Sequence, residues 1–382
     1  MAGEVRHPID IAALERYISQ NVPQIKVPLD VKQFGFGQSN PTYQLTATDG
    51  TKYVLRKKPA GKLVSQSAHK VEREHRIIAA LQTSGVPVPR AYCLCEDAAV
   101  LGTPFYIMSF VAGRIFEDAT IPSARSPSDR KALWRAAVEA LASLHRVDPD
   151  AVGLGTFGRR GGFYDRQLAT WRQICDAQAR TTDIETGDPV GAIPHMDALM
   201  AYFSDAKRRP RDRVTLVHGD YKIDNVVFAP AEPRVAGILD WEMSTIGHPL
   251  SDLANLMHPF TAASMSASIK DKSGDDALLS VSHPGFLPGA TPGLPEPSEV
   301  LAWYAAAAGW EPRPEEVAWA SAFSVFRLAA ICQGIAARVA RRQASSAHAR
   351  RHAAAMRPLG EFAWELVSKE IEKTKKGETA KL

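Results

Sequence analysis

The chain has 382 residues, of which 46 are Lys or Arg and 42 are Asp or Glu, so its formal net charge is +4. Apolar residues make up 45% and charged residues 23% of the sequence, which excludes collagen-like, disulfide-scaffold and disordered classes. This length accommodates two domains. The small positive charge does not indicate a nucleic-acid partner, and it is compatible with an anionic small molecule.

The four cysteines, Cys93, Cys95, Cys175 and Cys332, are too few and too scattered for a secreted disulfide framework. No apolar run approaches the ~20 residues needed to span a bilayer. The first residues lack the uninterrupted apolar region of a secretory signal. We therefore expect a soluble protein with no membrane span, working in a reducing compartment.

The first predicted element is an amphipathic helix over residues 8–21. Residues 31–59 then predict two strands around a glycine-rich turn and a third strand, with the dipeptide Asp49-Gly50 at a tight hairpin turn. A helix is expected over residues 67–84, and two more strands over 91–111. These elements predict a small α+β N-lobe.

The rest of the sequence is mainly helical in pattern. Predicted helices cover residues 128–146, 166–180 and 194–207, a short β segment falls within 214–241, and helices resume after 251 and over 298–369. Residues 261–297 are rich in Ser, Gly and Pro and predict a long mobile loop on the active-site side. The predicted domains are an N-lobe over 1–109, a C-lobe over 110–370 and a charged tail over 371–382.

The strongest chemical signal is the run HGDYKIDN at residues 218–225, followed by ILDWE at residues 238–242. Phosphoryl transfer from ATP needs a carboxylate that orients and deprotonates the attacking hydroxyl, and it needs oxygen ligands for Mg²⁺. Asp220 and Asn225 have the spacing at which a kinase catalytic loop places these groups. We therefore predict Asp220 as the catalytic base, with Asn225 and Asp240 as metal ligands.

A single His-x-Asp is equally typical of ordinary loop residues, whereas the two runs together favour catalysis. His218 is expected to be a buried support that hydrogen-bonds the loop, rather than a base.

The nucleotide end is predicted in the N-lobe. Glycines in the turn over residues 34–40 let backbone N–H groups approach phosphate oxygens. The predicted ATP contacts in this turn are Gly35, Gly37, Ser39 and Asn40. A plain hairpin turn is the alternative interpretation.

The third strand carries a run of cations, of which Arg56 is the first candidate for the phosphates. Its predicted partner is Glu74 on the following helix, with Glu72 as the second choice. A solvated basic strand edge is the alternative. Residues 106–111 are expected to form the hinge between the lobes, where the backbone of Ser109, Phe110 and Val111 would contact adenine.

These motifs resemble the aminoglycoside phosphotransferase-like superfamily, for which HGDxxxxN and ILDWE are the signature. Further strings, among them FGFGQSNPTYQL, LHRVDPDAVGLGTFGR and LDWEMSTIGHPLSDLAN, resemble the kinase-like domain of acyl-CoA dehydrogenase family members ten and eleven over almost the whole chain. The resemblance implies a bilobal protein-kinase-like fold of the α+β class, with a small β-rich N-lobe and a larger, mostly helical C-lobe.

The same resemblance implies ATP- and Mg²⁺-dependent phosphorylation of a hydroxyl group, with a 4-hydroxyacyl-CoA in fatty-acid catabolism as the substrate. It also implies that Arg56 and Glu74 form an ion pair and that Asp252 braces the catalytic loop. His248 departs from the pattern, which usually has an acid there. The sequence shows no dehydrogenase domain, so no dehydrogenase activity is expected, and another protein must act on the phosphorylated product.

The segment from Val317 to Gly360 contains several arginines and no acidic residue. Such a segment disfavours a polycationic aminoglycoside as substrate, and Arg338, Arg341 and Arg342 are candidate contacts for the phosphates of CoA. A solvated arginine-rich helix is the alternative interpretation. A nucleic-acid role is not expected, because aromatic residues are not interleaved with these arginines.

Two other functions stay open at this point. The chain is compatible with a phosphotransferase for another small alcohol or an aminoglycoside-like substrate, and with a catalytically silent kinase-like binding module. The final residues Ala380, Lys381 and Leu382 resemble a peroxisomal address. A peroxisomal import receptor is therefore a predicted partner in a eukaryote, and a cytoplasmic location is expected otherwise.

Overall fold

The computed structural model describes residues 2–35, 40–59, 70–265, 269, 282–344, 346 and 348–379, with side chains to residue 376. Their contacts form two compact units, each made of three stretches of chain. The first unit comprises Met1–Glu117, Arg146–Phe157 and His218–Thr245, and the second comprises Asp118–His145, Gly158–Val217 and Ile246–Leu382. The two units therefore interleave along the sequence, and the predicted domain boundaries stay predictions.

The first unit is built on a six-stranded antiparallel sheet of order β1-β2-β3-β4-β6-β5. Its strands are β1 (Ala2–Gly3), β2 (Asp30–Phe34), β3 (Thr42–Thr46), β4 (Lys52–Lys57), β5 (Ala91–Cys95) and β6 (Phe105–Ser109). The predicted tight turn is present, because Gly50 has a φ of 81°. Strands β2 to β6 lie where the sequence predicts strands, whereas the two-residue strand β1 was not predicted.

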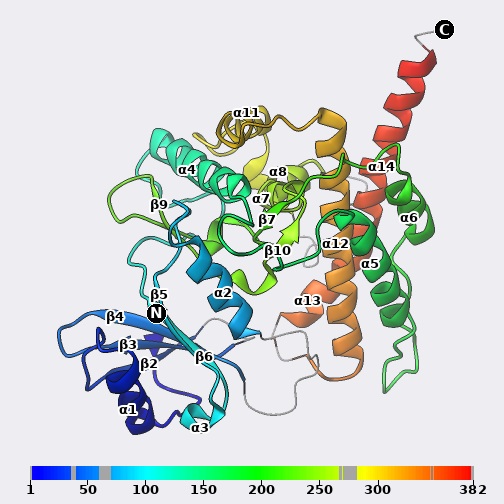
Figure 1. Ribbon diagram of the computed structural model, residues 1–382. Coiled ribbons are helices and arrows are strands. Elements are labelled where there is room, and N and C mark those ends of the chain that lie inside the picture. Colours follow the sequence, from blue (N-terminus) through cyan, green and yellow to red (C-terminus); the bar gives the residue numbers. More distant parts are fainter. Residues whose placement is uncertain are drawn as a thin grey trace. The chain divides into compact units, whose positions relative to one another are not determined.

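Alternation along the strands separates the two faces of this sheet. One face packs with α1 (Ile11–Asn21) and the short helix α3 (Ala98–Leu101), which was not predicted. The strand residues of this core are Tyr43, Leu45, Tyr53, Leu55, Phe105 and Ile107. Helix α2 (Val71–Leu81) contacts β5 and β6, and Figure 1 shows it on the opposite side of the sheet from α1. Arg56 and Tyr106, which pair across β4 and β6, therefore face α2.

An antiparallel ribbon of β8 (Val226–Phe228) and β9 (Val235–Ile238) completes the first unit. Two short 3-10 helices, η1 (Ile223–Asn225) and η2 (Trp241–Met243), flank the ribbon. The backbone N–H of Ile238 donates to the carbonyl of Pro87 at 2.8 Å, which ties β9 to the segment after α2. Strand β8 follows the first predicted catalytic run and β9 leads into the second, so both runs belong to the unit that contains the sheet.

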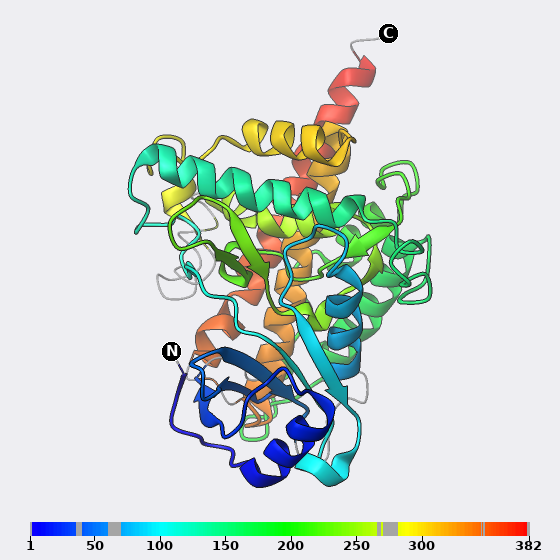
Figure 2. The ribbon, with the colours of Figure 1, turned by 60° about the vertical axis from the view of Figure 1, so that its left-hand side comes forward.

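The second unit is mainly helical. Its helices are α4 (Pro127–Arg146), α5 (Phe163–Ala179), α6 (Met196–Ser204), α7 (Leu250–Leu256), α8 (His258–Ala263), α11 (Pro297–Ala308), α12 (Pro314–Ala340), α13 (Ala349–Ala354) and α14 (Met356–Thr379). The long helix α12 contacts α5, α7, α8, α13 and α14, and Figure 1 shows it beside α14 and α5. Figure 2 shows α4 running alongside α11, where Lys131 Nζ lies 2.6 Å from Glu299 Oε1. A short ribbon pairs β7 (Thr215–Val217) with β10 (Thr245–Gly247).

Helix α12 also explains the one membrane-span candidate in the described part of the chain. By length and composition alone it is apolar enough to cross a bilayer, but 56% of its most apolar window is buried inside the protein. Burial among five helices is the behaviour of a core helix in a globular unit.

The structure describes only some of the segments for which the sequence predicts a loop or a tail. Helix α14 continues to Thr379, so most of the predicted charged tail is helical. In the predicted loop over residues 261–297, the structure describes the end of α8 and a 3-10 turn, Pro284–Phe286, and most of residues 266–281 lie outside the described residues. Ala380, Lys381 and Leu382 also lie outside them, so the peroxisomal address stays a prediction.

Candidate active site

The guanidinium group of Arg56 joins carboxylates from two other elements of the first unit. Its Nε lies 3.1 Å from Glu74 Oε2 on α2, and its Nη2 lies 3.0 Å from Asp240 Oδ1 and 3.3 Å from Glu242 Oε2. The arginine side chain is only 11% exposed. The predicted pairing of Arg56 with Glu74 is therefore present, and Arg56 also connects α2 with the ILDWE run.

Glu72, the second-choice partner of Arg56, points elsewhere. Its Oε1 lies 3.7 Å from Lys58 Nζ, and both of these side chains are partly exposed. Residues two apart in a helix lie on different faces, so Glu74 points inward and Glu72 points outward.

The carboxylate of Glu74 is fully buried and receives contacts from three side chains. Asn40 Nδ2 donates to it at 2.9 Å and the Tyr106 hydroxyl at 3.0 Å, in addition to the ion pair with Arg56. Burial raises the pKa of Glu74 to about 7, and the charge of Arg56 acts in the opposite direction. Burial lowers the pKa of Arg56, but Glu74 and the other acidic groups raise it, and the net shift is upward.

The predicted catalytic loop turns at Gly219, and only glycine suits this position. Its φ is 88°, and a Cβ there would lie 2.5 Å from the carbonyl oxygen of Met243. Asp220 follows directly, and Asn225 Nδ2 donates to the backbone oxygen of Asp220 at 2.8 Å and to its Oδ2 at 3.2 Å. The predicted base and the predicted first metal ligand are thus in direct contact.

His218 connects the two predicted runs. The buried imidazole donates from Nε2 to the carbonyl of Leu239 at 2.8 Å, and its Nδ1 accepts the N–H of Asp220 at 3.2 Å. These contacts fit the structural role that the sequence predicted for this histidine. Because Leu239 precedes Asp240, the same ring fixes the backbone beside both predicted catalytic carboxylates.

Opposing effects set the ionisation of Asp220. Burial raises its pKa, while the cation of Lys222, whose Nζ lies 3.7 Å from Asp220 Oδ2, lowers it. The net direction is upward, as suits a carboxylate that takes a proton from a hydroxyl group.

Asn225 and Asp240 are held near one another by the ribbon. The N–H of Leu239 donates to the carbonyl of Asn225 at 2.9 Å, and Asp240 has a left-handed backbone with a φ of 63°. Amide and carboxylate oxygens are the ligands that Mg²⁺ prefers. In the described part of the chain, no three His, Cys, Asp or Glu side chains gather as a metal site. Two oxygen ligands fit Mg²⁺, which keeps several waters and takes phosphate oxygens as further ligands.

The other predicted nucleotide contacts lie at or beyond the ends of strands β2 and β6. Gly35 follows β2 and is exposed, whereas Gly37 and Ser39 lie outside the described residues. Ser109 ends β6, and its Oγ accepts the N–H of Arg90 at 2.9 Å. The ring of Phe110 stacks on Phe34 with centroids 6.5 Å apart, and Val111 packs against Gly237 of β9.

The remaining predicted residues belong to the second unit. Asp252 is fully buried, with Oδ2 3.3 Å from His145 Nε2. Arg338 and Arg341 are exposed, at the C-terminal end of α12 and directly after it. The guanidinium of Arg342 lies 3.0 Å from Asp183 and 2.5 Å from Glu185, so its charge is already paired.

His248, where the sequence departs from the expected pattern, has both ring nitrogens in use. Its Nε2 donates to the carbonyl of Arg211 at 3.0 Å, and its Nδ1 accepts the N–H of Leu250 at 3.2 Å. Burial lowers the pKa of His248 to about 4, so the ring is neutral near pH 7.

Sequence reasoning missed three features of this site. It did not identify Glu242 and Tyr106 as partners in the Arg56 network, and it did not predict the hydrogen bond from Asn40 to Glu74, while the predicted phosphate contact of Asn40 stays a prediction. The register of β4 against β6 places Tyr106 opposite Arg56, which is a pairing that sequence patterns do not specify.

The first unit combines an antiparallel sheet, an ion pair between Arg56 on a strand and Glu74 on a helix, and a loop of the HGDxxxxN type. The second unit is mainly helical. Together these features define a protein-kinase-like fold. Residues 30–284 match the model of the phosphotransferase enzyme family, and the chain belongs to this family.

Curated relatives carry the names of acyl-CoA dehydrogenases. The chain is 37% identical over 370 residues to acyl-CoA dehydrogenase family member 11 of Gallus gallus, covering 95% of this chain and 44% of that protein. It is 41% identical over 349 residues to the probable acyl-CoA dehydrogenase IBR3 of Arabidopsis thaliana, covering 87% and 39%. The chain thus spans less than half the length of these relatives.

Solved structures agree on the fold. A Ralstonia eutropha protein, provisionally assigned as an aminoglycoside phosphotransferase, is 36% identical with a TM-score of 0.76, covering 95% of this chain and 99% of that one. The GDP complex of aminoglycoside 2'-phosphotransferase-IIIa is 15% identical with a TM-score of 0.56, covering 93% and 99%, and shows likeness of fold alone.

Proposed function

We propose that this protein uses ATP and Mg²⁺ to phosphorylate the hydroxyl group of a hydroxyacyl-CoA. The observation that carries the catalytic part is the assembly of Asp220, Asn225 and Asp240 by His218 and the β8–β9 ribbon, beside the buried Arg56–Glu74 pair. Solved relatives of the same fold were crystallised with ADP or AMP-PNP, which supports a nucleotide as phosphoryl donor.

Each residue has a defined task in this proposal. Asp220 accepts the proton of the attacking hydroxyl group, and the amide of Asn225 orients that carboxylate. Asn225 and Asp240 hold the metal ion, which when bound neutralises phosphate charge. Arg56 carries positive charge toward the donor phosphates, and Glu74 keeps its side chain in place.

The acyl-CoA part of the proposal rests on two observations. The curated relatives are named acyl-CoA dehydrogenases, and that name refers to an acyl-CoA substrate. An acyl-CoA that carries a hydroxyl group would also provide the alcohol that a phosphotransferase needs as acceptor. In addition, the acid-free segment from Val317 to Gly360 leaves exposed cations at Arg338 and Arg341, which suit the phosphates of CoA.

The test is ATP turnover with a panel of hydroxyacyl-CoAs, the corresponding free hydroxy acids, choline-like alcohols and aminoglycosides. D220A and D240N are expected to lower kcat by roughly a hundredfold or more, since each removes a group that acts in the transition state. D197N replaces a carboxylate that is 89% exposed and serves as the matched control. If no hydroxyacyl-CoA is phosphorylated, the substrate assignment fails.

A double variant, R338Q with R341Q, separates the CoA contact from catalysis. It is expected to raise KM for a hydroxyacyl-CoA about tenfold while leaving KM for the free hydroxy acid unchanged. An equal change in KM for both substrates would contradict a CoA contact and would indicate that these arginines only form a solvated helix surface.

The Ralstonia eutropha relative favours a second candidate, an aminoglycoside acceptor. Turnover of an aminoglycoside in the same panel, with no turnover of any CoA thioester, would establish this alternative. Absence of turnover with every alcohol, together with ATP binding, would instead indicate a kinase-like binding module.

A further inference from the structure

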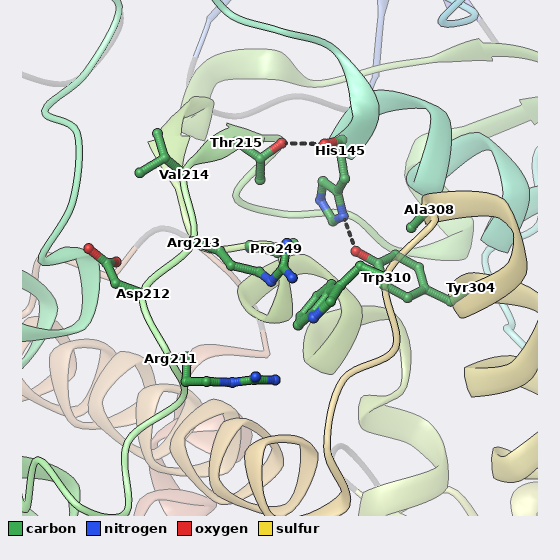
Figure 3. A pocket seen from close by; sticks show the side chains of 10 residues that line it. All are labelled: His145, Arg211, Asp212, Arg213, Val214, Thr215, Pro249, Tyr304, Ala308 and Trp310. Carbon is green, nitrogen blue, oxygen red and sulfur yellow. Dashed lines mark hydrogen bonds between the residues drawn. The ribbon is translucent and has the colours of Figure 1, made fainter.

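A cavity of about 470 Å³ lies in the second unit and contains none of the residues assigned above to the base, the metal or ATP. The residues around it are His145, Arg211, Asp212, Arg213, Val214, Thr215, Pro249, Tyr304, Ala308 and Trp310, as Figure 3 shows. Its volume falls in the range of sites that bind small molecules.

The side chains of residues 211–213 alternate in direction along the chain, which separates the two arginines from the aspartate at this cavity. Figure 3 shows the side chains of Arg211 and Arg213 extending toward Trp310, while the carboxylate of Asp212 points the other way. There Asp212 Oδ2 accepts the N–H of Gly162 at 2.9 Å. The cavity therefore faces two guanidinium groups and not the carboxylate between them.

The two arginines differ in how far their charge is already paired. Arg211 Nε lies 3.0 Å from Glu316 Oε1. Arg213, by contrast, has no carboxylate within ion-pair distance in the described part of the chain, and its guanidinium carbon lies 4.1 Å from the centroid of the Trp310 ring. Burial and the neighbouring charge of Arg211 lower the pKa of Arg213, so an anion placed here would relieve a repulsion.

Other polar side chains also line this cavity. The indole Nε1 of Trp310 is buried and has no hydrogen-bond partner among the described residues. The Tyr304 hydroxyl lies 2.8 Å from His145 Nδ1, and His145 Nε2 lies 3.3 Å from the buried carboxylate of Asp252. These contacts link Tyr304, His145 and Asp252 to one another. The cation of Arg213, which has no carboxylate within ion-pair distance among the described residues, is thus the group that most favours an anionic ligand.

We propose that this cavity binds a small phosphate-bearing molecule, held by Arg213 and Arg211 beside the ring of Trp310. Planar guanidinium groups bind phosphate oxygens in pairs, and charge-assisted hydrogen bonds of this kind are the strong ones. The site is separate from the proposed kinase function and needs no catalytic group. Its wall includes Thr215, whose strand β7 leads directly into His218.

The test is titration of the full chain with glycerol 3-phosphate, inorganic phosphate and acetate, followed by calorimetry and by tryptophan fluorescence. Glycerol 3-phosphate is expected to bind and to change the emission of Trp310, so the optical signal should disappear in W310F. R213Q is expected to weaken binding about tenfold or more. R135Q, which removes an arginine that is 59% exposed on α4, is the matched control and should bind as the wild type does.

Two results would overturn the proposal. One is a wild-type protein that binds neither phosphate saturably, or binds acetate as tightly as glycerol 3-phosphate. The other is R213Q binding that differs from the wild type by less than about threefold, since the cation without a carboxylate partner is the proposed anchor. D220A keeps the outcome independent of catalysis, because it should bind the phosphate normally even if no kinase substrate is ever found.

Discussion

His218 donates a hydrogen bond of 2.8 Å to the carbonyl of Leu239. The same ring accepts the backbone N–H of Asp220. A single buried side chain therefore sets the position of two loops that are separated by about twenty residues of sequence and that carry the proposed base and a proposed metal ligand.

Replacing His218 by alanine should leave the carbonyl of Leu239 and the N–H of Asp220 without these partners. We expect a loss of roughly 2–4 kcal/mol in the free energy of unfolding, because buried polar groups would be unsatisfied and a cavity would form. H218Q can restore one of the two hydrogen bonds and should recover part of the stability. Urea unfolding of both variants measures this, and equal stability of H218A and the wild type would contradict it.

Gly219→Ala combines a strained backbone with a steric clash. The φ of 88° disfavours any side chain, and the new Cβ would lie 2.5 Å from the carbonyl of Met243. Gly85 provides the control, since its φ is 81° and a Cβ there would meet nothing within 4 Å. G85A should cost about 1 kcal/mol and G219A several, with kinase activity lost only in G219A. Similar costs in thermal unfolding would exclude the clash as the cause.

Glu74→Ala should be strongly destabilising, since it leaves the buried cation of Arg56 without its partner on α2. Breaking one side of a buried ion pair costs about 3–5 kcal/mol. E72A is the matched control on the same helix, because the partly exposed pair of Glu72 with Lys58 should contribute less than about 1 kcal/mol. Urea unfolding compares the two variants, and a cost for E74A as small as that for E72A would argue against a buried network.

The stability of the protein should depend on pH through Glu316. Burial raises the pKa of this carboxyl, whereas hydrogen bonds from Arg211 and from the backbone of Arg313 lower it. The lowering is larger, and the pKa of Glu316 is about 2. The folded-state pKa therefore lies below the ordinary value of 4.5, so the stabilisation is present above pH 4.5 and is lost as the pH falls toward 2. Because Arg211 is 54% exposed, we expect about 1–2 kcal/mol rather than the full shift.

Comparison of E316Q with the wild type measures that contribution. The difference in unfolding free energy should be largest near pH 7 and should shrink between pH 4.5 and 2. A difference that stays constant over this range would show that packing, and not the charge of Glu316, accounts for the stabilisation.

Local sequence patterns predicted most strands and helices, and motif spacing predicted Asp220, Asn225 and Asp240 as neighbours. What they did not predict depends on long-range geometry. Tyr106 faces Glu74 because of the register between β4 and β6, and Glu242 contacts Arg56 across 186 residues of sequence. The cavity at Arg213 is formed by residues from four separated stretches, which no local pattern brings together.

The interleaving of the two units has a consequence for how the chain acquires its structure during synthesis. The sheet strands are made first, but the ribbon that packs against Val111 and Pro87 emerges only when the chain reaches Ile238. Until then Arg56 lacks the carboxylates of Asp240 and Glu242, and contacts this distant in sequence form slowly. A nascent chain that ends before residue 240 therefore lacks Asp240 and Glu242, and the first unit is completed only after the first two stretches of the second unit have been made.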